Sequence, residues 1–383
     1  MANVLDYVKW RGDLPFEAVP FCEVDALVFA ELTFLEYSGC CDAAPGGRAP
    51  TLGEIVEAFF SDCGEEEISL GKIIPGEIVE LFRLCGTSAR YSSCRVAAYV
   101  NIHDEENVEQ FCACTFLVPD GSIFAAFRGT DDTIVGWKEN FQMTFRSPVP
   151  AQEHAAKYLS EVGKYFPIHA LRLGGHSKGG NLAVWAASHA SPEVRKRIIR
   201  IYNLDGPGFR PEIEKDSGFE EIRPRIRTIV PECSVVGMLL DHDEKYYAVK
   251  STNKGIMQHD GMSWQVLGGE FVPAGEISRD TLRVNRLLSA WIGSMDDECR
   301  EKFTEAFFNI VYSTKAGTLT ELADKLPELF RAFSVADAET RHAINAGMRL
   351  LLGESKRTVS SWAHRHLSPP EKPPKSDDPD EIE

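Results

Sequence analysis

Residues 175–179 carry the sequence feature that most limits what this chain can fold into. They read GHSKG and place Ser177 between glycines in a G-x-S-x-G pattern. A short apolar run with Leu171 and Leu173 leads into the pattern, and an Ala-rich segment at helical spacing follows it. Small residues suit such a site because a sharp turn brings the strand and helix backbones close together. The order strand, sharp turn, helix predicts a serine hydroxyl lifted above the carboxyl edge of a sheet.

Hydrophobic periodicity predicts how the rest of the chain is organised. Before residue 90 the apolar residues recur three and four apart, which predicts helices over 24–37, 52–60 and 77–84. Three short runs at 95–127 predict a β-meander, and helices then alternate with strands, including strands at 198–204 and 225–230. Further apolar patches occur at 235–240, 246–249 and 263–267, and helical periodicity returns over 282–291, 303–311, 319–333 and 344–352.

This alternation, together with the serine turn, predicts an α/β-hydrolase fold with a largely parallel central sheet. The regions that we expect are a helical N-terminal region (1–90) packed on the core, an α/β-hydrolase core (91–275), a helical C-terminal region (276–367) and a disordered, acidic, Pro-rich tail (368–383).

Composition excludes several classes of partner. The formal net charge is −17, so no basic field exists to neutralise nucleic-acid phosphates. No window reaches 18 uninterrupted apolar residues, so no integral membrane span is expected. The chain begins without a secretory signal pattern, and its ten cysteines contain no C-x-x-C pair. We therefore expect free buried thiols and a cytoplasmic protein, with no metal ion and no cofactor.

A reactive serine needs a general base, which in this fold lies after it in the chain. The histidines that follow Ser177 are at positions 189, 242, 259, 342, 364 and 366. His259 lies in a polar loop after the last expected core strand, where the base belongs topologically. His242 lies in an acidic cluster, where a salt-bridged surface imidazole is the simpler interpretation. The sequence favours His259 and leaves His242 as the alternative.

The acid that orients the base has more than one candidate. Asp205 ends the strand that follows the serine strand and precedes Gly-Pro-Gly. Aspartate also favours such turns for purely local reasons. Glu232, just after the next strand, is the alternative acid, and Asp241 is a further one. The sequence favours Asp205.

Acyl transfer also requires two donors that stabilise an oxyanion. One predicted donor is the backbone amide of Lys178, directly after the serine. The other is Thr130, which follows Gly129 at the end of the strand SIFAAF and offers both an amide and a hydroxyl.

These motifs carry a family resemblance. FRGT at 127–130, a Trp-bearing segment and GHSKGG at 175–180 together resemble the class 3 triacylglycerol lipases, the fungal type of α/β hydrolase, over about residues 95–265. The resemblance implies the oxyanion role for Thr130, the nucleophile role for Ser177 and a lid position for 131–140, which is more polar than a lipid-adsorbing lid. The whole chain resembles a bacterial family of uncharacterised lipase-like α/β hydrolases.

The resemblance also indicates which residue is the acid of the triad. NLDGPGF at 203–209 is similar to a pancreatic-type lipase segment whose aspartate is the triad acid, which supports Asp205. Class 3 lipases usually place their acid after the next strand, where this chain has Ser234. The assignment therefore stays open between Asp205 and another acid.

Two functions from different classes follow. The first is a serine esterase that acts on a small-molecule ester with an apolar acyl group, for example a lysophospholipid or an acylglycerol. A peptidase or thioesterase using the same triad fits the sequence as well. The second function is a catalytically inactive hydrolase-fold scaffold, which binds a partner protein through the helical terminal regions.

Overall fold

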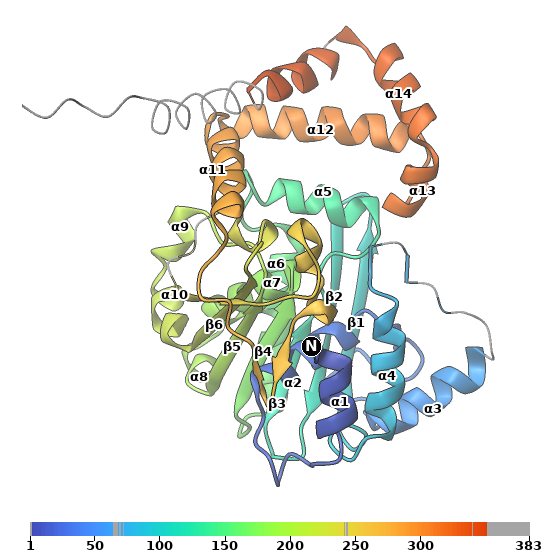
Figure 1. The fold of residues 1–383 in the computed structure, drawn as a ribbon, viewed down its shortest axis with the longest axis vertical. Helices are drawn as coiled ribbons and strands as arrows, with labels where there is room; N and C mark the ends of the chain where they lie inside the picture. Colours follow the sequence, from blue (N-terminus) through green and yellow to red (C-terminus); the bar gives the residue numbers. More distant parts are fainter. Residues whose placement is uncertain are drawn as a thin grey trace, which may run out of the picture.

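The fold is built around a seven-stranded sheet whose strands lie side by side in chain order (Figure 1). The computed structural model describes residues 2–63, 68, 70, 71, 73–240, 242, 244–338 and 340–350. The strands of the sheet are β1 (Arg95–Asp104), β2 (Glu109–Leu117), β3 (Ile123–Phe127), β4 (Leu171–His176), β5 (Ile198–Leu204), β6 (Ile226–Pro231) and β7 (Tyr246–Val249). β1, β2 and β3 pair antiparallel, and every pair from β3 to β7 is parallel. The predicted meander and the largely parallel sheet are confirmed.

Helices cover both faces of this sheet (Figure 1). One face is covered from the N-terminal side by α1 (Val4–Arg11), α2 (Glu23–Leu32), α3 (Leu52–Cys63) and α4 (Glu77–Thr87). The other face is covered by α6 (Pro150–Tyr165), α7 (Lys178–His189), α8 (Pro192–Arg195), α9 (Pro211–Glu214) and α10 (Ser217–Ile222). Short 3-10 turns are η1 (Arg223–Arg225), η2 (Val236–Met238), η3 (Gly255–His259) and η4 (Gly261–Ser263), and β8 (Val266–Leu267) pairs with β9 (Glu270–Phe271).

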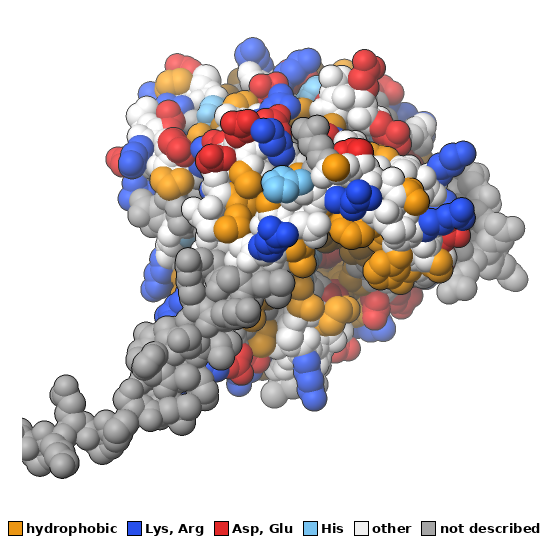
Figure 2. Space-filling view, turned by 90° about the horizontal axis from the view of Figure 1, so that it is seen from above, with side chains coloured by type: hydrophobic (Ala, Val, Ile, Leu, Met, Phe, Trp, Pro, Cys, Tyr) orange, Lys and Arg blue, Asp and Glu red, His pale blue; other side chains and the backbone are white. Residues whose placement is uncertain are grey.

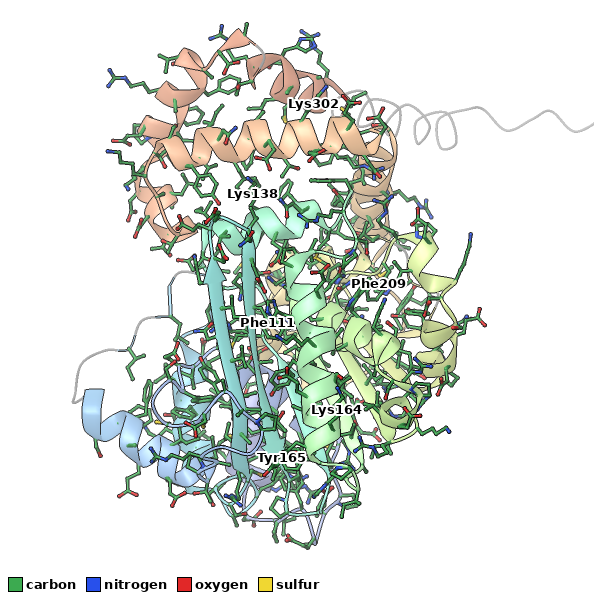
Figure 3. All side chains as sticks on the ribbon, turned by 180° about the vertical axis from the view of Figure 1, so that it is seen from behind. Phe111, Lys138, Lys164, Tyr165, Phe209 and Lys302 are labelled. Atoms are coloured by element: carbon green, nitrogen blue, oxygen red, sulfur yellow. The ribbon has the colours of Figure 1, made fainter. Side chains whose placement is uncertain are left out.

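The middle strands are buried on both faces, as their nearly continuous apolar sequences require. Along β2 the side chains alternate between two cores, with Cys112 and Cys114 on the α2 side and Phe111 and Ala113 on the α6 side. Figure 3 shows Phe111 between the sheet and α6. α2 is buried along almost its whole length and packs against β3, β4 and β5. It is therefore part of the core that positions the end of β4.

A buried ion pair fastens the N-terminal helices to the chain that enters the sheet. Arg90 and Asp25 are both fully buried, and Arg90 Nη2 lies 2.6 Å from Asp25 Oδ2. The hydroxyls of Tyr7 and Tyr91 also donate to Asp25. Arg90 Nε and the backbone N–H of Cys22 donate to it as well, so five donors compensate this carboxylate despite its burial.

The C-terminal helices form a cap above α5 (Ile134–Gln142), at the end of the sheet where β3 and β4 finish (Figure 1). The cap consists of α11 (Arg279–Gly293), α12 (Asp297–Ser313), α13 (Leu319–Asp324) and α14 (Leu326–Val335), followed by a helical segment at 340–350. Figure 2 shows hydrophobic side chains gathered on the outer face of this cap, and the exposed apolar residues of α14 include Phe330 and Val335.

The cap is tied to α5 by apolar, ionic and backbone contacts. Phe308 and Val311 of α12 pack against Ile134. Lys138 of α5, labelled in Figure 3, forms a 2.8 Å ion pair with Glu305 of α12. The backbone N–H of Ile134 donates to the Gly317 carbonyl over 2.9 Å. The expected lid segment is thus a helix held between the sheet and α12.

Several predicted elements differ in the structure. The helix predicted over 319–333 is broken into α13 and α14, because a proline stands in the first turn of α14. The apolar patch at 235–240 forms only the 3-10 turn η2, and α5 was not predicted. The tail at 368–383, residues 351–367 and Asp241 lie outside the described residues.

Nine cysteines, those whose side chains the structure describes, are free thiols, and the buried ones are Cys41, Cys85, Cys94, Cys112 and Cys114. The other four are half-buried, so the expected burial holds only in part. Within the described part of the chain, no helix combines the length and the hydrophobicity that a bilayer crossing requires.

Candidate active site

Ser177 lies at the junction of β4 and α7, as the glycine pattern predicts. Its backbone has φ 56° and ψ −133°, a conformation that costs energy for a residue with a side chain. The turn is crowded by backbone: a Cβ at Gly175 would lie 2.4 Å from the carbonyl carbon of Gly179. A Cβ at Gly179 would lie 2.1 Å from the Phe127 oxygen. Only glycine fits at either position, which is why the motif has this spacing.

The structure brings Asp205 and His259 together, although 54 residues separate them in the sequence. Asp205 follows β5 and is fully buried, and His259 ends η3 with its side chain 26% exposed. Asp205 Oδ2 lies 2.6 Å from His259 Nδ1. A carboxylate at Nδ1 fixes the ring orientation and leaves Nε2 as the proton-accepting atom.

The second oxygen of Asp205 is held by Ser234. Ser234 Oγ donates to Asp205 Oδ1 over 2.5 Å. In turn, Asn285 of α11 donates to the Ser234 carbonyl over 3.1 Å. A Cβ at Gly237 would lie 2.1 Å from Asp205 Oδ1, so the chain also approaches closely there. Asn285, which the sequence analysis missed, connects the cap to this carboxylate.

The alternative acid, Glu232, and the alternative base, His242, bond to groups outside the proposed triad. Glu232 is half-buried, and its backbone N–H donates to the Val249 carbonyl. His242 Nδ1 lies 3.0 Å from Glu244 Oε1, and both side chains are over 90% buried. The salt-bridged imidazole expected at His242 is therefore present, but it is a buried pair rather than a surface one.

The predicted oxyanion residues lie next to the elbow. A Cβ at Gly129 would lie 2.6 Å from the His176 oxygen, so the loop that carries Thr130 passes close to the serine turn. Thr130 is buried, and its hydroxyl bonds the side chain of Asn140 in α5. Lys178 is the first residue of α7, where backbone N–H groups have no partner inside the helix.

The side chain of Lys178 forms a buried network that the sequence analysis did not predict. Its ammonium is 1% exposed and lies 2.8 Å from Glu139 Oε2, which is fully buried. The same nitrogen donates to the backbone carbonyl and to Oε1 of Gln110 over 2.7 Å each. Gln110 Nε2 donates to the Gly129 carbonyl over 3.4 Å. The network therefore ties α7, β2, α5 and the Thr130 loop together.

Ser177 and His259 line one cavity of about 640 Å³, and Thr130 and Lys178 line it as well. Its walls are mainly apolar side chains of α5, α11 and α12, including Trp137, Phe141, Leu288, Trp291, Ile292 and Phe303. Ile73, Ile256 and Met257 line the same cavity and are each more than 40% exposed, which places them at its mouth. The cavity therefore suits an apolar chain that approaches the serine from the surface.

Two further carboxyl groups line this cavity, Glu31 of α2 and Asp260. Burial raises the pKa of Asp260 to about 6 from its usual value near 3.8. Burial, reinforced by the charge of Asp260, also raises the pKa of Glu31. Both groups hold their protons more tightly in the folded chain than in the unfolded chain.

Replacing Asp260 by asparagine is expected to change how stability depends on pH. Because the folded state binds the Asp260 proton more tightly, its contribution to the free energy of unfolding falls as the pH rises from about 4 to about 6. The variant should lose this part of the decline, as measured by urea unfolding at pH 4, 5, 6 and 7. The exposed change Asp280→Asn serves as the control, and an unchanged slope in Asp260→Asn would contradict the expectation.

Comparisons with known proteins were made for sequence and for structure. No curated protein matches the chain in sequence. A Rhizomucor miehei lipase–propeptide complex is 12% identical, with a TM-score of 0.37 over 66% of this chain and 82% of that chain. A deletion mutant of that complex is 15% identical, with a TM-score of 0.36 over 60% and 86% of the two chains. A fungal lipase–inhibitor complex is 14% identical, with a TM-score of 0.34 over 59% and 79%.

A family model also matches the chain. The Mbeg1-like family model matches residues 85–309, from the end of α4 to α12. That span contains Ser177, Asp205 and His259 and covers more than half of the chain. The chain belongs to the Mbeg1-like family.

Proposed function

We propose that this chain is a serine hydrolase that cleaves carboxylic esters, with Ser177 as nucleophile, His259 as general base and Asp205 as the orienting acid. The observation that carries the proposal is the 2.6 Å contact between the buried Asp205 and His259 Nδ1. Ser177, held at positive φ, lines the same cavity as His259. A buried carboxylate on one imidazole nitrogen supports the proposal, because such a pair activates a serine for acyl transfer.

The reaction proceeds in two stages. Ser177 Oγ attacks the ester carbonyl while His259 Nε2 takes its proton, and the imidazolium is stabilised by Asp205. The imidazolium then protonates the departing alcohol, which leaves an acyl group on Ser177. Water, deprotonated by His259, attacks this acyl-enzyme and releases the carboxylic acid. Serine and histidine end in their starting states.

The negative oxygen of each tetrahedral intermediate is stabilised by the Lys178 amide and by Thr130. The amide belongs to the N-terminus of α7, where the helix dipole favours negative charge. Asn140 Nδ2 donates to Thr130 Oγ1 over 2.7 Å, which holds the hydroxyl oxygen in place, and the hydroxyl proton turns from Asn140 Oδ1 to the oxyanion when the intermediate forms.

The substrate that we propose is a small ester with an apolar acyl group, such as a lysophospholipid or an acylglycerol. The support is the apolar lining of the cavity and its exposed apolar mouth. We also propose a cytoplasmic location, where free thiols like those of this chain persist.

A fluorophosphonate probe tests the proposal, because it reacts with serines that are activated by a base. We expect one probe per chain, located on Ser177 by peptide mapping, and no labelling of His259→Ala or of urea-unfolded protein. Absence of labelling in the folded wild-type protein would refute the enzyme and favour the scaffold that binds a partner protein.

A further inference from the structure

His176, the residue before the serine, lies between Glu31 and the backbone of His259. His176 Nε2 lies 2.7 Å from the carbonyl oxygen of His259. On its other side, His176 Nδ1 lies 3.3 Å from Glu31 Oε1. Both side chains are more than 90% buried, and both residues line the catalytic cavity. The three groups thus form a line from α2 to the loop that carries the proposed base.

The positions of the protons along this line follow from the chemistry of the groups. A carbonyl oxygen can only accept, so His176 Nε2 carries a proton that it donates to His259. Burial lowers the pKa of His176 to about 3, so the ring is neutral and Nδ1 holds a lone pair. Glu31 Oε1 is buried, has no hydrogen-bond partner among the described groups and lies 3.3 Å from Nδ1. Burial raises the pKa of Glu31 and so favours its protonated form, whose hydroxyl can meet the Nδ1 lone pair.

Packing around the three groups leaves little room for other arrangements. The rings of His176 and His259 lie 4.8 Å apart between centroids, and Trp264 meets His176 edge-on at 6.1 Å. A Cβ at Gly261 would lie 2.7 Å from Glu31 Oε1. The glycine therefore lets the loop after His259 close against the Glu31 carboxyl.

We propose that Glu31 is a positioning residue for the general base: through His176 it holds the His259 carbonyl and thereby fixes the position of the His259 ring. This inference rests on the proposed function of His259. It assigns the N-terminal helix α2 a part in the active site. In η3, Ile256 and Met257 are about 60% exposed, whereas Gln258 is buried and accepts hydrogen bonds from Cys233 and Trp264. The bond from His176 to the His259 carbonyl adds a tie at the residue that carries the ring.

The test compares Glu31→Gln with Glu31→Leu, using p-nitrophenyl butyrate as substrate. The amide of glutamine still donates to His176 Nδ1, whereas leucine has no donor. We expect kcat within about three-fold of wild type for glutamine and about 10–100-fold lower for leucine, with KM within two-fold in both. Glu36→Leu, an exposed glutamate after the same helix, serves as the matched control.

The pH profile supplies a second readout. Once Glu31 ionises, its carboxylate faces the lone pair of His176 Nδ1, so kcat of the wild type should decline at high pH. The glutamine variant should not show this decline. The other titratable groups that face the pair are Asp260 and His259, with Glu77 of α4 beyond Asp260. The same profile measured on Asp260→Asn separates their contribution.

A measurement without activity separates failure of this inference from failure of the proposed function. In 15N-histidine spectra, assigned with His176→Asn, wild-type His176 should remain neutral and protonated at Nε2 from pH 5 to 8. The leucine variant should change the shifts of His176 and His259, and the glutamine variant should not. Unchanged shifts in a folded leucine variant, wild-type kcat in that variant, or equal losses in both variants would each overturn the proposal.

Discussion

Ser177→Ala is expected to lower kcat for ester hydrolysis by about a million-fold, to a residual rate due to substrate binding and the oxyanion donors. The hydroxyl is the only proposed nucleophile, so no other group replaces it. Initial rates on p-nitrophenyl esters of graded acyl length measure the effect. Ser188→Ala is the matched control, because Ser188 lies on the same helix and its hydroxyl bonds the Trp185 carbonyl.

Asp205→Asn tests, by its effect on kcat, whether Asp205 is the acid that orients His259. Asparagine keeps the size of the side chain but orients the wrong imidazole tautomer, which costs about 10⁴-fold in kcat when the acid belongs to the triad. Glu232→Gln should leave kcat within about two-fold, since the described contact of His259 Nδ1 is with Asp205. A large loss in Glu232→Gln with little loss in Asp205→Asn would transfer the acid role to Glu232.

Lys178→Met is expected to lower the free energy of unfolding by about 3–5 kcal/mol, the typical cost of leaving a buried charge without its partner. The carboxylate left behind is that of Glu139, which is fully buried. Urea unfolding followed by tryptophan fluorescence measures the change. The size of the effect follows from burial, because an exposed pair at the same distance contributes little.

A double-mutant cycle isolates the Lys178–Glu139 interaction. Removing both charges, in Lys178→Met with Glu139→Leu, should cost about 2–3 kcal/mol less than the sum of the single changes. The exposed Lys302–Glu298 pair on α12, 2.7 Å apart, is the control and should show no measurable coupling. Additive losses at Lys178 and Glu139 would mean that the pair is not coupled.

The positions of most strands along the chain and the serine elbow could be predicted because both depend on local patterns. β5, predicted over 198–204, has those bounds in the structure, and the crowded backbone at Gly175 and Gly179 explains the glycine spacing. Local patterns also predict Asp205 and His259 as residues at the carboxyl edge of the sheet. Their mutual distance depends on how the loop at 255–263 folds back, which no local pattern determines.

The site residues that could not be predicted contact residues that lie far from them in the sequence. Asn285 reaches Ser234 from a helix 51 residues later, and Glu31 reaches His176 from a helix far before it. A signal for Glu31 did exist: α2 reads EVDALVFAEL, and an acid in so apolar a helix must be neutral or paired. Asp25 of the same helix meets that requirement by pairing with Arg90.

The helix α5 was not predicted from the sequence for a different reason. Its stability comes from being held between the sheet and α12, and its nine residues are too few for an isolated helix to be stable in water. The polar character of 131–140 is explained in the same way. Thr133, Lys138 and Asn140 bond other protein groups, so the polar segment does not require exposure to water.

Much of the cavity wall and the proposed catalytic residues come from separate stretches of the chain. Ser177, Asp205 and His259 are held by the ends of the sheet, whereas much of the apolar wall comes from α11 and α12. Substitutions in those two helices that avoid Asn285 can therefore reshape the chamber while leaving the reacting atoms in place. If the proposed esterase function holds, such substitutions change which acyl chains fit the chamber without moving Ser177, Asp205 or His259.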